Sequence, residues 1–152
     1  MESLERILVE YPFLRGMKEE HMKLLVGCAS NVRFDAGKFI LREGEEADLF
    51  YLIREGNVAI EFSAPERGAI IFQTVGKGEV LGWSWLVPPY RWRFDARAIE
   101  LTRAIALDGK CLRAKCEGDC CLGYELFKRF SQVMVSRLQA ARLQFLNVYE
   151  NR

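Results

Sequence analysis

The sequence predicts a mainly β fold, a β-roll or jelly roll with short helices before it and one long helix after it. Between residues 32 and 108, short apolar runs alternate with glycine-containing turns, which is typical of an all-β body. The residues before this body have the apolar spacing of helices, and so does the run from about residue 119 to residue 149. The chain has 152 residues, half of them apolar, which is enough for one domain with a substantial core.

Residues 1–31 are expected to form short N-terminal helices. Ser3 can cap a helix that begins at the next residue, and Pro12 interrupts the helical pattern. Four apolar residues of the following segment lie near one helical face: Met17, Met22, Leu25 and Val26.

Residues 32–108 are expected to form the β-roll. The strand-like runs are VRF, KFILRE, LFYLI, NVAIEF, AIIFQTV and RAIAL. Strands this short need a second layer to complete a core. The runs therefore predict a closed or double-sheet arrangement.

Residues 109–152 are expected to form a short helix and then a long one. A helix of about 30 residues would extend roughly 45 Å, longer than a domain of this size needs to cover its own core. Its apolar residues are spaced almost like a coiled-coil seam: Phe127, Phe130, Met134, Leu138, Ala141, Phe145 and Val148. This stripe predicts a homodimer through the long helix. The alternative is that the helix folds back over the roll of its own chain.

The composition argues against several classes of function. The net charge is +1, so no general attraction draws the chain to nucleic acid or to an anionic membrane. The N-terminus lacks the pattern of a signal peptide and no 18 apolar residues run together, so a cytoplasmic location is expected. The single histidine, His21, cannot supply a metal site inside the roll or serve as a base there, so no enzymatic activity is expected.

The five cysteines are an odd number, and two of them are adjacent: Cys28, Cys111, Cys116, Cys120 and Cys121. This pattern argues against a disulfide framework and for a reducing compartment. The spacing of the last four matches no common zinc or iron–sulfur motif. They are therefore expected to be buried or incidental thiols, with no metal site.

Residues 44–60 read GEEADLFYLIREGNVAI and resemble the cyclic nucleotide-binding domain of the catabolite-activator and Fnr-like regulators. The family pattern is G-[DE]-x-A-[DE]-x-[FL]-[YF]-x-[IL]-x-x-G-x-V. The residues that fall on it are Gly44, Glu45, Ala47, Asp48, Phe50, Tyr51, Ile53, Gly56 and Val58. The resemblance extends from about residue 32 to the end of the chain, because the family follows its β-roll with a short helix and a long dimerising helix.

Residues 78–98, GEVLGWSWLVPPYRWRFDARA, stand where the family has its phosphate-binding cassette. We call this segment the cassette. In the family it is a tight loop and a short helix whose free N–H groups receive a phosphate, with a glutamate for the ribose hydroxyl and an arginine for the phosphate. The turn residues Gly78, Glu79 and Gly82 match the family. Trp83 stands in the place of the glutamate, and Trp85 replaces a small residue.

Arg93 has the spacing that the family gives to its phosphate-binding arginine, although counting back from Ala96 puts Phe94 in that place. The resemblance therefore implies a binding site for a cyclic nucleotide or another anionic small molecule. Its expected residues are Gly82, Trp83, Ser84, Trp85 and Arg93.

Two features of the cassette leave alternatives open. Arg91, Arg93 and Arg97 would form an anion clamp, or an ion-pair ladder with Asp95 on the surface. The aromatic side chains would form a box that stacks on a planar ligand, or a plug that fills the place of a lost nucleotide. These aromatic residues are Trp83, Trp85, Tyr90 and Trp92.

The whole sequence predicts one cyclic nucleotide-binding-like domain over residues 1–152, acting as a stand-alone sensor or regulatory module without a DNA-binding domain. Its expected partners are a second copy, a small-molecule ligand and an unidentified downstream protein, with no nucleic acid and no membrane. The alternative is a ligand-free dimerisation or protein-interaction module with a tryptophan-plugged cassette.

Overall fold

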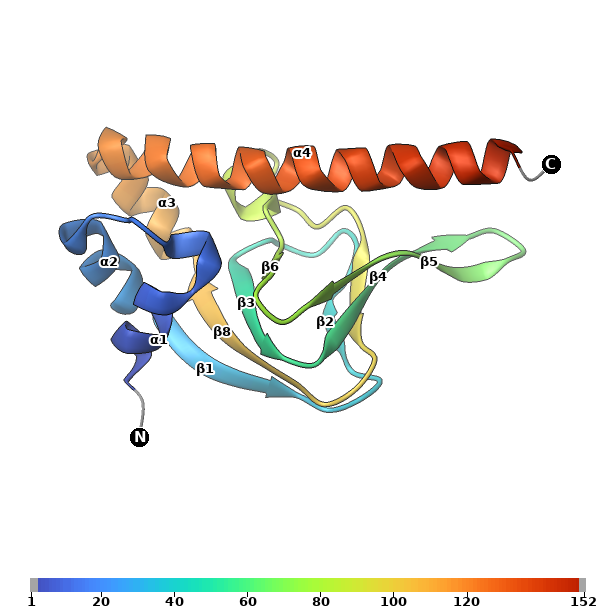
Figure 1. Cartoon of the computed structure of the whole chain (residues 1–152), viewed down its shortest axis with the longest axis horizontal. Helices are drawn as coiled ribbons and strands as arrows, with labels where there is room; N and C mark the ends of the chain where they lie inside the picture. The colour runs from blue at the N-terminus through green and yellow to red at the C-terminus, as the bar shows by residue number, and fades with distance from the viewer. Residues whose placement is uncertain (1–2, 151–152) are drawn as a thin grey trace.

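A computed structural model describes residues 3–150 as a β-roll with helices before and after it (Figure 1). The predicted fold class is confirmed. Three short helical segments come first: α1 (Leu4–Glu10), the 3₁₀ turn η1 (Pro12–Leu14) and α2 (Glu19–Val26).

Tyr11, between α1 and η1, attaches the N-terminal helices to the roll. Its side chain is buried, and its hydroxyl donates a hydrogen bond shared between the carbonyl oxygens of Ile53 (2.8 Å) and Glu79 (2.9 Å). Burial, followed by the nearby Glu79 charge, raises the pKa of Tyr11 far above its usual range. The hydroxyl therefore remains a donor and holds the start of the cassette against the N-terminal helices.

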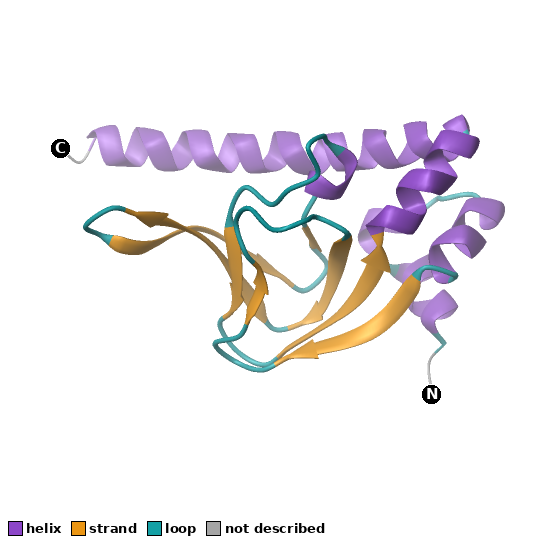
Figure 2. Cartoon of the chain, turned by 180° about the vertical axis from the view of Figure 1, so that it is seen from behind, coloured by secondary structure: helices purple, strands orange, loops and turns teal. Residues whose placement is uncertain are grey.

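The roll consists of two antiparallel four-stranded sheets, ordered β1-β8-β3-β6 and β2-β7-β4-β5. Its strands lie on one side of the long C-terminal helix (Figure 2). The two inner faces share one apolar core, as short strands require. The strands are β1 (Ala29–Phe34), β2 (Phe39–Leu41), β3 (Leu49–Glu55), β4 (Asn57–Ala64), β5 (Gly68–Gly76), β6 (Val80–Leu81), β7 (Asp95–Ala98) and β8 (Thr102–Asp108).

The hairpin between β3 and β4 turns at Gly56, whose φ is +99°. A Cβ atom at this position would lie 2.6 Å from the carbonyl oxygen of Leu101 and 2.6 Å from the hydroxyl of Thr102. Only glycine meets both the backbone conformation and the close approach of the neighbouring chain.

Two helices follow the roll: α3 (Gly109–Gly118) and α4 (Cys120–Glu150), which at 31 residues is about 46 Å long. Asp108 caps α3, because its side chain accepts a hydrogen bond from the N–H of Cys111 at 2.9 Å. No helix within residues 3–150 is long and apolar enough to cross a membrane.

Only the first part of α4 packs on the roll. Its buried residues are Leu122, Leu126 and Phe130, and every described residue from Leu138 onward is exposed. The C-terminal part extends away from the body of the roll, on the side of the β4–β5 hairpin (Figure 1). Phe130, expected in the dimer seam, lies in the core of its own chain because it packs against the cassette.

We predict that Gly56→Ala destabilises the fold more than Gly44→Ala. Gly44 also has a positive φ, +88°, but nothing lies within 4 Å of its would-be Cβ, so alanine there meets only backbone strain of about 1–2 kcal/mol. Alanine at Gly56 meets the same strain and a backbone clash. Urea denaturation of both variants measures the difference, and equal losses would contradict this account.

Candidate functional site

The cassette crosses from the first sheet to the second and is held by the loop that carries the family motif. It contains β6, the 3₁₀ turn η2 (Ser84–Leu86) and β7. The N–H of Ala47 donates to the carbonyl oxygen of Tyr90 at 2.8 Å, and the N–H of Trp92 donates to that of Glu45 at 3.0 Å. The GEEAD stretch therefore supports the cassette with its backbone.

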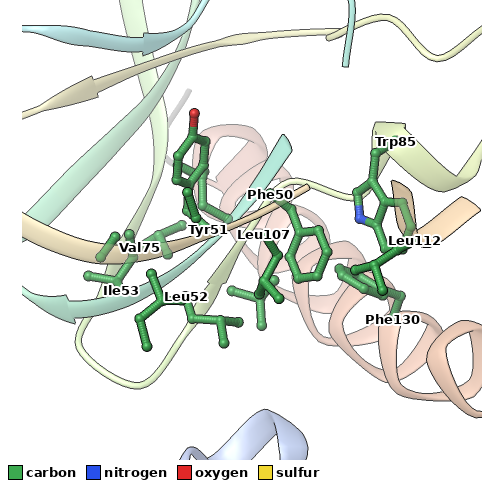
Figure 3. Close-up of a cluster of buried hydrophobic side chains, with 14 of the residues drawn as sticks. Phe50, Tyr51, Leu52, Ile53, Val75, Trp85, Leu107, Leu112 and Phe130 are labelled. Carbon is green, nitrogen blue, oxygen red and sulfur yellow. The ribbon is translucent and has the colours of Figure 1, made fainter. Parts of the chain in front are cut away.

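Trp85 is the largest fully buried side chain of the cassette. Its side chain is 0% exposed and stacks on Phe50, with ring centroids 4.7 Å apart and planes 10° apart. The Phe130 ring lies at 74° to it, with ring centroids 5.6 Å apart (Figure 3). A Cβ on Gly109 would lie 2.9 Å from Trp85, so the start of α3 also closes on this ring. Trp85 thus packs in the core between the roll, α3 and α4.

A second tryptophan, Trp92, covers the glycine turn of the cassette. Gly82 has φ +95°, and a Cβ there would lie 2.6 Å from the six-membered ring of Trp92, which is only 5% exposed. Phe94 lies next to it, with ring centroids 6.3 Å apart. The backbone that the family uses for phosphate is thus in contact with an aromatic ring. Ser84, which follows Trp83, is itself buried.

The arginines of the cassette occupy the opposite face of the chain. Burial alternates along residues 91–98, so that Trp92, Phe94, Ala96 and Ala98 are buried while Arg91 and Arg93 are exposed. Arg93 therefore belongs to the outward-facing row and not to the row that lines the interior of the roll.

The neighbours of Arg93 are engaged on the surface of the second sheet. Arg91 donates to the carbonyl oxygen of Gly44 at 3.0 Å, and Arg97 pairs with the buried carboxylate of Glu61 at 3.0 Å. Asp95 accepts from the N–H of Glu43 at 2.8 Å and pairs with Arg42 at 3.7 Å. Ion pairs do form here, but Arg97 takes its partner from β4 and Asp95 takes its partners from the turn after β2.

Arg113 of α3 holds the cassette from the other side. Its Nη1 donates to the carbonyl oxygens of Trp85 (2.7 Å) and Ala47 (3.1 Å), and its Nη2 pairs with Asp48 at 3.2 Å. The guanidinium also lies over the ring of Tyr90, 4.2 Å from its centroid. This planar fork joins the cassette, the motif loop and α3 through one side chain.

Arg137 of α4 makes a similar contact with the start of the cassette. It donates to the carbonyl oxygen of Val80 and lies over the ring of Trp83, 5.2 Å from its centroid. Its Nη1 is buried without a hydrogen-bond partner among the described residues. Burial lowers the pKa of Arg137, and the charge of Glu79 acts in the opposite direction. The group stays charged, as guanidinium groups do in proteins, and an anion would suit it.

A cleft of about 630 Å³ opens beside Arg137, between η1, the turn at residues 78–80 and α4. Arg15, Lys128 and Arg129 also line it, together with the acidic Glu79 and Glu125. Arg129 is engaged by Glu125 at 2.9 Å and by the carbonyl oxygen of Phe13 at 2.7 Å. The cleft is therefore mixed in charge, with a basic excess of two groups.

Candidate metal ligands do not gather in the described part of the chain. His21 is buried, with its Nε2 3.6 Å from Asp119. Within residues 3–150 no three His, Cys, Asp or Glu side chains are placed to hold a metal ion.

Comparison with known proteins identifies the family of this chain. The profile described as "Cyclic nucleotide-binding domain" matches residues 31–119, which include the motif loop and the whole cassette. The chain belongs to the cyclic nucleotide-binding domain family. Membership supports a regulatory, ligand-binding module as the general class of function.

Three relatives illustrate the likeness. Human cGMP-dependent protein kinase 2 is 26% identical over 57% of this chain and 11% of its own length. A CRP-like cAMP-activated global transcriptional regulator of Mycobacterium tuberculosis is 25% identical over 73% of this chain and 50% of its own. A solved structure of a candidate cyclic nucleotide-binding protein from Geobacter metallireducens matches with a TM-score of 0.80 and 29% identity, covering 91% of this chain and 99% of that one. This chain thus spans half or less of these two curated relatives.

Four of the five expected site residues, Gly82 to Trp85, are consecutive in the sequence, and the fifth, Arg93, is exposed on the outward-facing row of its strand segment. Binding of a ligand by these residues remains a prediction. Sequence reasoning missed Arg113 and Arg137, which contact the cassette from the two C-terminal helices. An arginine on a helix carries no signal of such a role, although the motif residue Asp48 marks one partner of Arg113.

We predict that Trp85→Ala lowers the free energy of unfolding by about 3–5 kcal/mol, because it leaves a cavity beside the Phe50 and Phe130 rings. Trp83→Ala is the matched control, since the Trp83 ring is only half-buried and lies against the Arg137 guanidinium. Denaturant unfolding monitored by far-UV circular dichroism gives both values. A smaller loss for Trp85→Ala than for Trp83→Ala would contradict the assignment of Trp85 to the core.

Proposed function

We propose that this domain is a regulatory module whose cassette is filled by its own side chains and coupled directly to the long helix α4. The observation that carries the proposal is the burial of Trp85 between Phe50 of the roll and Phe130 of α4. This corresponds to the tryptophan-plugged alternative drawn from the sequence. In this proposal the domain keeps the regulatory role of the family, but the Trp85 side chain, in place of a bound ligand, connects the cassette to α4.

The residues that fill the cassette also remove the usual chemistry for a cyclic nucleotide. A carboxylate that accepts hydrogen bonds from the ribose is replaced by Trp83, and the inward row at the expected arginine holds Trp92 and Phe94. An anionic phosphate beside these rings would lose hydration without gaining a charged partner. The Mycobacterium tuberculosis relative is named as cAMP-activated. We expect this chain not to respond to cAMP through the same groups.

The proposed output is a homodimer formed through α4. Beyond the part that packs on the roll, the helix exposes a row of large apolar side chains, with Leu138 at 63% and Phe145 at 68% exposure. Exposed apolar rows of this length favour association with another apolar surface. A second α4 supplies a matching one, and a downstream protein would then recognise the dimer.

A sensor of a small anionic ligand is the second candidate, and Arg137 favours it. The unpartnered Nη1 and the neighbouring basic cleft provide a place for a phosphate or carboxylate. A planar ligand that displaced the guanidinium from Trp83 would stack on that ring and change the docking of α4. Arg93 would contact such a ligand only if the segment around it rotated so that its exposed side chains faced the interior of the roll.

A thermal-shift screen separates the two candidates. Cyclic AMP, cyclic GMP, cyclic dinucleotides, other nucleotides and small organic anions are added to the purified chain. A self-filled cassette predicts no shift with cAMP or cGMP, whereas a ligand at about 100 times its dissociation constant would add about 2.7 kcal/mol. A shift that Arg137→Ala abolishes and Arg93→Ala retains would establish the sensor at Arg137. A shift with cAMP that depends on Arg93 would overturn the proposed function.

We predict that Leu138→Glu weakens self-association by more than about tenfold, because a charge in an apolar seam costs at least about 1.4 kcal/mol. Ala140→Glu is the control, since Ala140 is also exposed but lies on a different face of α4. Sedimentation equilibrium of the three proteins measures the dimer constant. A monomeric parent chain at micromolar concentration would exclude the proposed dimer.

A further inference from the structure

Two of the five thiols lie side by side at the junction of α2, β1 and α3. The Sγ atoms of Cys28 and Cys111 are 3.3 Å apart, and both residues are half-buried. Cys28 directly precedes β1, while Cys111 lies in the first turn of α3, 83 residues later. The Nζ of Lys115 lies 3.4 Å from the Sγ of Cys28. Sequence spacing, which suggested incidental thiols, gave no indication of this contact.

From this geometry we infer that Cys28 and Cys111 form a reversible disulfide under oxidising conditions and that the bond fastens α3 to the α2–β1 junction. The two backbones are already connected here, since the N–H of Asp108 donates to the carbonyl oxygen of Cys28 at 3.0 Å. A disulfide needs its sulfurs about 2.05 Å apart. Closing the gap takes little more than about 1 Å, which side-chain rotation and small backbone adjustments provide.

The surroundings favour closure of this pair over reaction of Cys28 alone. Burial, followed by the hydrogen bond with Cys111, raises the pKa of Cys28, so that this group rests as a thiol. The ammonium of Lys115 acts in the opposite direction and stabilises the Cys28 thiolate when it forms. Cys28 is therefore suited to be the second nucleophile, which attacks a sulfur that is already beside it.

The step requires an oxidant, and a low-molecular-weight disulfide supplies it. The Cys111 thiolate attacks one sulfur of that disulfide, forming a mixed disulfide and releasing one small thiol. The Cys28 thiolate then attacks the Cys111 sulfur, forming the internal bond and releasing the second small thiol. Two protein thiols are oxidised, one small disulfide is reduced to two thiols, and these take up the two protons that leave Cys28 and Cys111.

The position of the pair connects it to the cassette. Cys111 lies two residues before Arg113, whose guanidinium holds the carbonyl oxygen of Trp85, and two residues after Gly109, which packs on the Trp85 ring. A bond at Cys111 therefore restrains the helix that closes over the cassette. This inference does not depend on whether the cassette is self-filled or binds a ligand.

The test uses the full chain with Cys120→Ser and Cys121→Ser, which removes the two exposed thiols. The protein is incubated with oxidised glutathione and digested without reduction, and the peptides are mapped by mass spectrometry. The expected product is a Cys28–Cys111 linked peptide within a monomeric chain, reversed by dithiothreitol. Cys116 is an internal control, because burial raises its pKa to about 11 and it should stay unmodified.

Three further variants make the test specific. Cys28→Ser, or Cys28→Ala as a second replacement, should abolish the linked peptide and leave glutathione bound at Cys111. Lys115→Gln should make that mixed disulfide accumulate before closure. The oxidised parent chain should melt several degrees higher than the reduced chain, because a bond across 83 residues restricts the unfolded state. Glutathione adducts without the internal bond, bonds only between chains, or a lower melting temperature on oxidation would overturn the inference.

Discussion

The contact between the Trp85 ring and its aromatic neighbours is the constraint on which the rest of the structure depends. Phe50 comes from the roll, Phe130 from the long helix and Trp85 from the cassette, so one cluster joins three parts of the chain (Figure 3). The Trp85 ring needs a neighbouring residue without a side chain, and Gly109 at the start of α3 provides that space. The cluster therefore fixes how far the cassette and both C-terminal helices can move apart.

Two arginines repeat one arrangement around this cluster. Arg113 of α3 donates to the carbonyl oxygen of Trp85 and lies over Tyr90, while Arg137 of α4 donates to that of Val80 and lies over Trp83. Each guanidinium satisfies a backbone acceptor and covers an aromatic face at the same time. The helices are thus attached to the cassette by polar contacts around an apolar centre. Movement of either helix would break a hydrogen bond as well as a stacking contact.

The sequence predicted the roll because its information is local. Short apolar runs, glycine turns and the motif at residues 44–60 each describe a few adjacent residues, and the strands follow them. The direction of Arg93 was also available in the sequence. The stretch RWRFDARA alternates charged and small or apolar residues, so that burying Trp92 and Phe94 turns Arg93 outward. Arg93 was predicted from its spacing along the chain alone. That spacing does not take into account which residues of the alternating stretch face the interior.

Contacts between distant elements could not be predicted in the same way. The predicted dimer seam of α4 included Phe130, which is buried in its own chain. The spacing of apolar residues shows which face of a helix is apolar, but not which part of that face packs on the same chain. The contacts of Arg113, Arg137 and Cys28 depend on how α3 and α4 pack against the roll. The proposed regulation through Cys28 and Cys111 depends on that placement. Because α3 carries Cys111 two residues before Arg113, a change at the thiol pair reaches the Trp85 carbonyl through a single helical turn, with no need for a ligand between them.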